Sequence, residues 1–306
     1  MKRLIGEFEE QNYTQIIFPH EKTDWKDYLQ EAESTFVNII NAIRRFQTCL
    51  VVCYDVQEVK KHFADQNNIV FVEYESNDTW ARDCSALSVK EGEKSQLLDF
   101  TFNAWGSKFE SNKDNLLTKT VTPEAIECDF VLEGGGVESN GVDAILTTSS
   151  CMLNKSRNPH LSKERINEKL HEYFGATKIL YLEHGYLAGD DTDSHVDTLA
   201  RFISENAIMY VKCEDENDEH FEELRLMEGE LQTIAKEHAY ELIALPMTDG
   251  VYYEDERLPA TYANFLFVNG AVLVPIYGVG QDEKALSIFR NAFKDREIVA
   301  IDCSVL

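Results

Sequence analysis

The chain has 306 residues, of which 43% are hydrophobic, and its formal net charge is −26. This length and composition predict a globular protein with one large core or two smaller domains, and they exclude a disordered chain. The negative charge argues against nucleic acid and anionic membranes as partners, because their phosphates would repel it, and it is compatible with a small cationic substrate.

The cysteines and the apolar runs indicate where the protein resides. Seven cysteines, irregularly spaced and without a Cys-x-x-Cys pair, favour free thiols over a disulfide framework or a zinc site. The first residues lack the apolar core of a signal peptide, and no apolar run approaches the roughly 20 residues that cross a bilayer. We therefore expect a soluble cytoplasmic protein.

Four hairpins are predicted where turn residues interrupt apolar runs. The strongest signal is Asn269-Gly270, since Asn-Gly favours the two-residue turn that joins antiparallel strands. In chain order the hairpins cover residues 86–98, 137–146, 196–211 and 265–274. A polar cluster precedes each hairpin, and the four clusters are residues 77–83, 133–136, 190–197 and 261–264.

Helical patterns lie between the hairpins. Apolar residues recur at helical spacing in four segments, which are 25–43, about 158–174, 221–235 and 286–293. A single strand is expected at 298–301. The unit of hairpin, helix and strand therefore repeats, and repeats of this size are typical of radial or stacked arrays. A closed ring would bring the polar clusters to one central site.

The cluster at 190–197, Asp-Asp-Thr-Asp-Ser-His-Val-Asp, combines a histidine with several acids. If this segment enters a strand, His195 and Asp197 project from the same face, because residues i and i+2 do so. A histidine beside carboxylates has a raised pKa and can exchange protons near neutrality. A solvated acidic turn explains such a stretch in isolation, but the recurring clusters favour a cation-binding site.

Five ordered motifs make the chain resemble the agmatine deiminases, which belong to a wider guanidine-modifying superfamily with the bacterial peptidylarginine deiminases. The motifs are residues 77–83, 102–106, 132–135, 153–159 and 195–197. A further match is Asn264, in the strand before Asn269-Gly270. The resemblance implies an α/β fold, namely a five-bladed α/β propeller (pentein) of hairpin–helix–strand units around a central site.

The same resemblance implies a reaction and its catalytic residues. Agmatine would be hydrolysed to N-carbamoylputrescine and ammonia, a step of putrescine biosynthesis in polyamine metabolism. Asp83 and Asp197 would hold the planar guanidinium between paired carboxylates. His195 would act as general acid and base. A cysteine thiolate would attack and form a covalent amidino-thioester.

The remaining implied contacts concern the rest of the substrate. Trp80 would flank the alkyl chain, and Glu133 together with Asp190 or Asp191 would contact the polar groups of agmatine. The resemblance implies no metal and no organic cofactor. It also implies that a homodimer is possible.

The chain departs from the family at the nucleophile. The family carries that cysteine in a C-terminal Gly-Gly-x-x-His-Cys segment, which is not found within 1–306. We expect it after Leu306, in a hairpin that would follow strand 298–301, so that 1–306 is a single catalytic domain lacking this hairpin. Cys303 is predicted to be a buried thiol, and Cys84 to point away from Asp83 on a strand. The other cysteines are assigned to packing: Cys49, Cys53, Cys128, Cys151 and Cys213.

Two alternatives to agmatine hydrolysis stay open on the sequence. The same chemistry could act on free arginine or on peptidylarginine. A protein of another class, which binds a guanidinium or polyamine without turnover, would also fit the acidic clusters. The acidic loop at 190–193 favours an amine over a carboxylate at the far end of the substrate.

Overall fold

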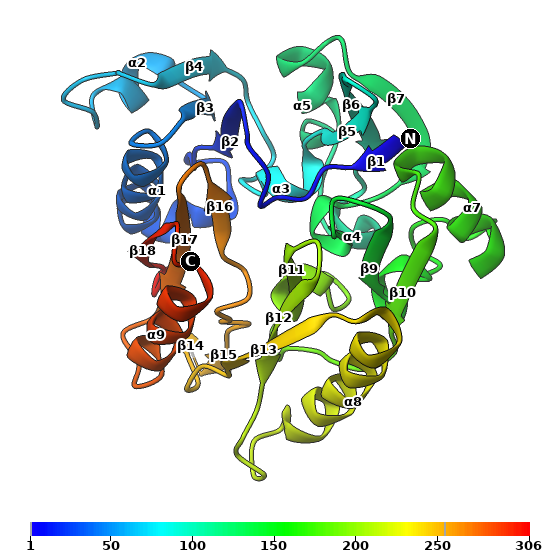
Figure 1. Cartoon of the computed structure of the whole chain (residues 1–306). Helices are drawn as coiled ribbons and strands as arrows, with labels where there is room; N and C mark the ends of the chain where they lie inside the picture. Colours follow the sequence, from blue (N-terminus) through cyan, green and yellow to red (C-terminus); the bar gives the residue numbers. More distant parts are fainter. Residues whose placement is uncertain (1, 254) are drawn as a thin grey trace.

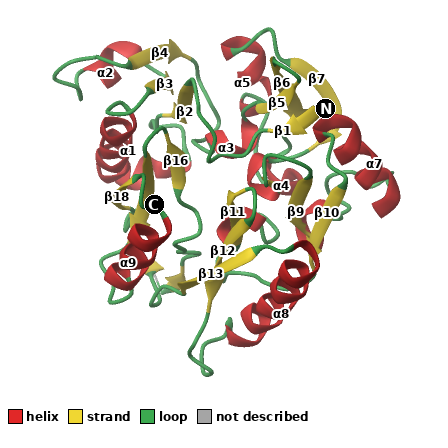
Figure 2. Ribbon diagram, viewed as in Figure 1, coloured by secondary structure: helices red, strands yellow, loops and turns green. Residues whose placement is uncertain are grey.

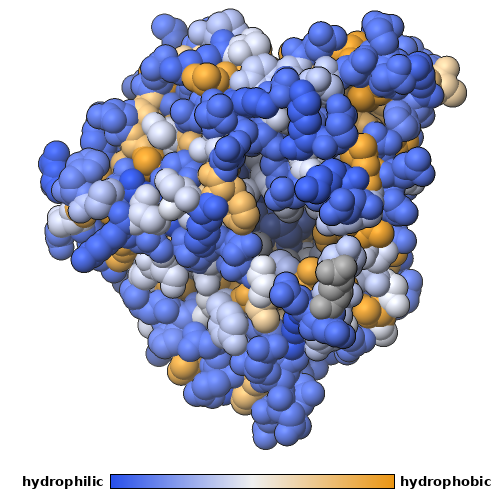
Figure 3. Space-filling model, turned by 180° about the vertical axis from the view of Figure 1, so that it is seen from behind, coloured by the Kyte–Doolittle hydropathy of each residue, from blue (hydrophilic) through white to orange (hydrophobic). Residues whose placement is uncertain are grey.

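The structure, a computed structural model, describes residues 2–253 and 255–306 and has an α/β fold. Strands lie toward the middle of the molecule and the longer helices toward its outside (Figures 1 and 2). The face shown in Figure 3 is mainly hydrophilic, with hydrophobic residues scattered over it. In the described part of the chain, no helix is both long and apolar enough to span a membrane.

Five sheets contain three or four strands each among the described residues. Their orders are β1-β5-β6-β7, β2-β3-β4, β10-β9-β8, β11-β12-β13 and β16-β17-β18. The strands are β1 (Lys2–Leu4), β2 (Tyr13–Ile17), β3 (Thr48–Cys53), β4 (Ile69–Glu73), β5 (Leu87–Glu91), β6 (Lys94–Thr101), β7 (Ile126–Val131), β8 (Glu138–Ser139), β9 (Ala144–Thr148), β10 (Lys178–Leu182), β11 (Ala200–Ser204), β12 (Ala207–Lys212), β13 (Glu241–Pro246), β16 (Leu266–Val268), β17 (Ala271–Ile276) and β18 (Glu297–Asp302). A separate ribbon pairs β14 (Tyr252–Tyr253) with β15 (Glu256–Arg257).

Helices connect and cover these sheets. The α-helices are α1 (Leu29–Ile43), α2 (Val56–Lys60), α3 (Ala81–Cys84), α4 (Ala104–Ser107), α5 (Asp114–Val121), α6 (Ser149–Met152), α7 (Lys163–Phe174), α8 (Phe221–His238) and α9 (Asp282–Ala292). Three 3₁₀ turns are η1 (Asp24–Tyr28), η2 (Gly134–Gly136) and η3 (Val196–Thr198). The long helices α1, α8 and α9 each pack on strands of two sheets or more, which links neighbouring sheets.

The predicted repeat of hairpin, helix and strand is confirmed in four sheets. In each, an antiparallel hairpin is followed by a helix and a parallel strand, as in β16-β17-α9-β18. The Asn269-Gly270 turn is confirmed, since Val268 pairs directly with Ala271 and Gly270 has a φ of +77°. The sheet β2-β3-β4 differs because all its strands are parallel.

Two predicted boundaries were wrong. The helix expected from Asn158-Pro159 begins at Lys163, where the Ser162 hydroxyl accepts a hydrogen bond from the Arg165 amide and caps it. It ends at Gly175 as predicted, with a left-handed φ of +64°. The helix expected from 25 to 43 is divided into η1 and α1, which meet at Tyr28 and Leu29.

The placement of His195 and Asp197 on a strand was also wrong. Residues 196–198 form η3, and the following strand β11 begins only at Ala200. The His195 carbonyl accepts hydrogen bonds from both the amide and the hydroxyl of Thr198, which bends the chain into a turn. Asp193 and Ser194 precede the turn with positive φ angles of 66° and 63°.

Buried charges connect the sheets near the centre. Arg201 on β11 has no exposed surface, and its Nε donates to Oε1 of Glu138 on β8 at 2.7 Å. Its guanidinium also donates to Glu7 and to the carbonyl of Phe265. Glu7 accepts a second guanidinium, that of Arg82. Burial raises the pKa of Glu138 to about 7 although Arg201 opposes the shift.

We expect Arg201→Met to destabilise the protein strongly, because Glu138 would stay buried without its guanidinium. Breaking a buried pair from one side typically costs about 3–5 kcal/mol of unfolding free energy. Arg45→Met is the matched control, because Arg45 and Glu297 form an ion pair whose side chains are about half exposed (50% and 49%), and such pairs contribute less than about 1 kcal/mol. Urea unfolding of both variants measures the difference, and equal losses would contradict a structural role for the buried network.

Candidate active site

Asp83 is held by groups from two separate segments. It lies in the single turn α3, and its Oδ1 accepts a hydrogen bond from the Gly135 amide at 2.8 Å. Its Oδ2 accepts from the indole Nε1 of Trp105 at 3.1 Å. Both carboxylate oxygens therefore have fixed positions, as a group that binds a planar cation requires.

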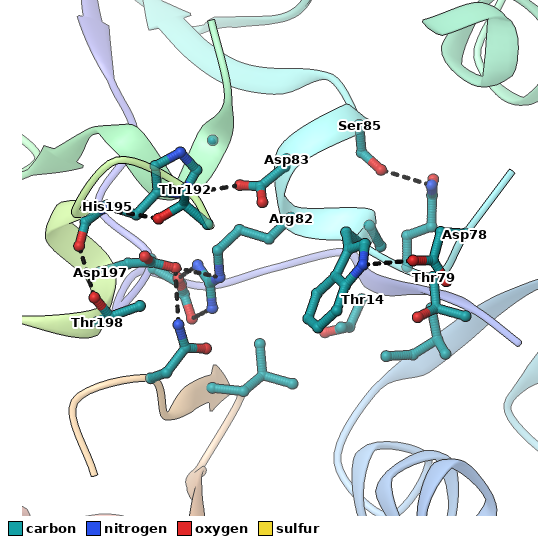
Figure 4. Close-up of a pocket in the computed structure, with 18 of the residues that line it drawn as sticks. Thr14, Asp78, Thr79, Arg82, Asp83, Ser85, Thr192, His195, Asp197 and Thr198 are labelled. Atoms are coloured by element: carbon teal, nitrogen blue, oxygen red, sulfur yellow. Dashed lines mark hydrogen bonds and ion pairs between the residues drawn. The ribbon is translucent and has the colours of Figure 1, made fainter. Parts of the chain in front are cut away.

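His195 and Asp197 lie beside Asp83, and Figure 4 shows the three side chains together. His195 Nδ1 is 3.6 Å from Oδ1 of Asp83. Asp197 Oδ2 accepts a hydrogen bond from Asn264 Nδ2 at 3.0 Å and lies 3.4 Å from Nε of Arg82. The four polar clusters predicted from the sequence thus meet at one place, each contributing a side chain or an amide.

Gly135 makes this approach possible. A Cβ at this position would lie 2.6 Å from His195 Nδ1, 2.8 Å from Asp83 Oδ1 and 2.9 Å from Asp197 Oδ2. All three distances are too short for a carbon atom, so the backbone of η2 can pack against the three polar groups only when residue 135 is glycine.

The charges around His195 favour its protonated form. Burial by itself lowers the pKa of the imidazole, but the negative charge of Asp83, with further contributions from Cys151 and Glu133, raises it well above its usual value. Burial raises the pKa of Asp197, and the positive charges of Arg82 and His195 oppose that rise. The site therefore favours an imidazolium between carboxylates, and such a group can donate a proton.

Glu133 lies on the far side of His195 from Asp83. It is fully buried, and its Oε2 accepts a hydrogen bond from Arg157 Nε at 2.7 Å and lies 3.9 Å from His195 Nε2. Burial raises the pKa of Glu133, but the combined effect of His195 and Arg157 leaves it below its usual value. The contact of Glu133 with polar groups of a substrate stays a prediction; within the protein its carboxylate faces His195 and Arg157.

The other predicted contacts have different surroundings. Trp80 is 44% exposed, and its ring forms part of the wall of the cavity. Its indole Nε1 donates a hydrogen bond to Asp78 at 2.8 Å. Asp190 accepts hydrogen bonds from Thr192 and Ser194 within its own loop and also lines the cavity, and its contact with a substrate stays a prediction. Asp191 is exposed and lines the cavity.

A large cavity opens onto this group of residues. Its volume is about 2330 Å³, and Trp80, Asp83, His195 and Asp197 line it. Residues 303–306 line the same cavity.

Cys303 follows β18 and is half-buried, so the expectation of a buried strand cysteine was wrong. Cys84 is buried, but it lies in the helical turn α3, so its predicted placement on a strand was wrong.

Three residues near the centre were missed as functional candidates. Trp105 orients Asp83, and Arg157 connects Glu133 with Asp193 at 2.7 Å to each. Both lie in motifs that carried the family resemblance, which was the available signal. Cys151, assigned to packing, is buried, but its Sγ lies within 4.8 Å of ligand atoms of His195 and Glu133. Its sequence context gave no such signal.

Comparison with known proteins shows which chains share this arrangement of elements. A model of the family described as Porphyromonas-type peptidyl-arginine deiminase matches residues 3–306. A solved C. jejuni agmatine deiminase, in which a cysteine is replaced by serine and substrate is bound, is 41% identical with a TM-score of 0.95, over 99% of this chain and 91% of that one. A candidate arginine deiminase from Porphyromonas gingivalis is 42% identical with a TM-score of 0.93, over 99% and 93%. An agmatine deiminase from Medicago truncatula is 29% identical, over 98% of this chain and 91% of its own.

We expect Gly135→Ala to disrupt the site and lower stability by about 1–3 kcal/mol, because its Cβ would overlap three polar groups. Gly229→Ala is the matched control. Gly229 lies within α8, where a Cβ meets nothing within 4 Å, so this change should stabilise the helix by up to about 1 kcal/mol. Opposite shifts in the urea midpoint are expected, and tolerance of alanine at 135 would contradict the close packing.

We expect Asp83→Asn to lower the pKa of His195, because the amide no longer stabilises the imidazolium by charge. A raised pKa contributes stability below the unfolded value of about 6.5, and this contribution is lost as the pH rises through the folded pKa. The variant should therefore lose more stability at pH 6 than at high pH. Histidine C–H resonances followed by NMR during a pH titration measure the shift, with exposed Asp129→Asn as the control that leaves it unchanged.

Proposed function

Because the chain belongs to the Porphyromonas-type peptidyl-arginine deiminase family, we propose that it hydrolyses agmatine to N-carbamoylputrescine and ammonia. The observation that carries this proposal is the packing of Asp83, His195 and Asp197 around Gly135 at the wall of one cavity. Two fixed carboxylates match the donors of a guanidinium, and an adjacent imidazolium can protonate a departing amine.

The reaction follows from these positions. Asp83 and Asp197 bind the guanidinium N–H groups and orient its central carbon. A thiolate attacks that carbon, and the bond to one terminal nitrogen breaks as His195 gives its proton to the leaving ammonia. The neutral imidazole then takes a proton from water, whose oxygen attacks the same carbon. The C–S bond then breaks and the thiolate leaves with the bonding electrons, while the new hydroxyl gives its proton to solvent and becomes the carbonyl of the carbamoyl group.

The attacking thiol belongs, in this proposal, to the Gly-Gly-x-x-His-Cys segment of the family. Residues 303–306 line the cavity. Cys151 is the cysteine near His195, but it is 1% exposed and lies outside the lining of the cavity.

The charges near the site favour agmatine over arginine. An α-carboxylate needs a cation, and the arginines beside the site are already paired, Arg82 with Glu7 and Asp197, and Arg157 with Glu133 and Asp193. Asp191 is exposed in the cavity, where a negative charge suits an ammonium group. Trp80 offers its ring to the butyl chain between the two ends.

The fold in this proposal is a five-bladed propeller. It is supported by the five sheets of the described chain and by the four in which a hairpin, a helix and a parallel strand follow one another. It is supported further by the meeting of loops from separate sheets at the site. Seven free cysteines are compatible with a reducing compartment such as the cytoplasm.

The proposal predicts ammonia release from agmatine by the full-length protein, at a higher kcat/KM than from free or peptidyl arginine. His195→Gln should lower kcat by roughly 10²–10⁴, because the proton donor is lost. His160→Gln is the control, since His160 is exposed, and it should leave kcat unchanged. Agmatine binding without ammonia release would favour a binding protein, and preference for arginine would overturn the substrate assignment.

A further inference from the structure

Three buried side chains present metal-ligating atoms to one another behind the ring of His195. One ligand atom each of Glu133, Cys151 and His195 lies within 4.8 Å of the other two. The three side chains come from separate elements: Glu133 precedes η2, Cys151 lies in α6 and His195 precedes η3. Their exposed fractions are 0%, 1% and 2%, so bulk water has little access to compete with these side chains for a bound ion.

Two of these side chains have unused polar atoms at this point. Among the described residues, neither Oε1 of Glu133 nor Nε2 of His195 has a hydrogen-bond partner, although both are buried. A buried polar atom without a partner costs free energy, and a bound cation supplies the missing interaction. Gly136 leaves the space open, since a Cβ there would lie 3.1 Å from Cys151 Sγ and 3.8 Å from His195 Nε2.

The groups around the three side chains resemble those that orient metal ligands. The other ring nitrogen of His195 faces the carboxylate of Asp83 at 3.6 Å, and a carboxylate at that position commonly fixes the tautomer of a ligating histidine. Arg157 binds Oε2 of Glu133 and leaves Oε1 free. The Cys151 amide donates to Thr148 at 3.3 Å, which fixes the turn that carries the thiol.

We propose that Glu133, Cys151 and His195 form a binding site for Zn²⁺, and that its occupation inhibits the enzyme reversibly. Thiolate, imidazole and carboxylate are the ligands that zinc takes, and three protein ligands leave a fourth position for water. His195 lines the cavity, so an entering ion meets that ring first and the thiol behind it. The ion is an inhibitor in this proposal and is not a cofactor.

Zinc would inhibit the enzyme because it occupies the lone pair on Nε2 of His195. Zinc on Nε2 takes the place of one of the two protons of the imidazolium, so the ring loses the acidic form that gives a proton to the leaving ammonia, and the thiol of Cys151 releases a proton when it binds. Bound zinc therefore blocks proton transfer without entering the cavity where the guanidinium would lie. Metal binding itself is independent of the proposed function, because it is measured without substrate.

The test is a titration of metal-free protein with ZnCl₂ by calorimetry and with CoCl₂ by absorption spectroscopy. We expect one ion per chain, protons released on binding, and a cobalt spectrum with tetrahedral d–d bands and a thiolate charge-transfer band. Cys151→Ser should weaken zinc binding by roughly 100-fold or more, since even groups that only orient ligands contribute 10–100-fold. Cys303→Ser is the matched control, a half-buried cysteine at the cavity wall, and it should bind as the wild type does.

Several outcomes would overturn the proposal. They are the absence of binding by wild-type protein, a cobalt spectrum without a thiolate band, or loss of that band in Cys303→Ser and not in Cys151→Ser. The cobalt spectrum of the wild type needs no variant, so it decides the matter even when Cys151→Ser fails to fold. Inactivity on agmatine together with zinc binding would contradict the proposed function and leave the metal site standing.

Discussion

Pairing of opposite charges at the buried centre is the constraint on which the rest of this structure depends. Arg82 and Arg201 share Glu7, Arg201 also binds Glu138, and Arg82 reaches Asp197. Each charge would be costly alone in the interior, so the segments that carry them must meet for the protein to fold. Asp197 of the candidate site is thus held by the same network that joins the sheets.

The charge of His195 depends on a neighbouring acid. Burial opposes a charged imidazole, and the nearby negative charge of Asp83 more than compensates for it. The ring therefore keeps a proton for a leaving group, yet its Nε2 faces a thiol and a carboxylate that together could hold a metal ion. One histidine placed between two sets of acidic groups thus accounts for both proposals, proton transfer toward the cavity and metal binding behind it.

The outcome of the sequence predictions follows the range of the interactions involved. Asn269-Gly270 predicted its hairpin because the turn depends on two residues, and Gly175 predicted the end of its helix for the same reason. The strand predicted at 195–197 failed because the bonds of Thr198 and the positive φ of Ser194 bend the chain there. An alternating pattern does not reveal such bonds.

The sequence by itself determined the repeating elements and the family and named Asp83, His195 and Asp197 as candidates, since turn residues, periodicity and ordered motifs are local properties of the chain. Only the tertiary structure decided what surrounds them. It paired Glu133 with Arg157 and placed Cys151 beside His195. These contacts join residues that are far apart in sequence, and their energies depend on burial and distance, which exist only once the sheets have packed together.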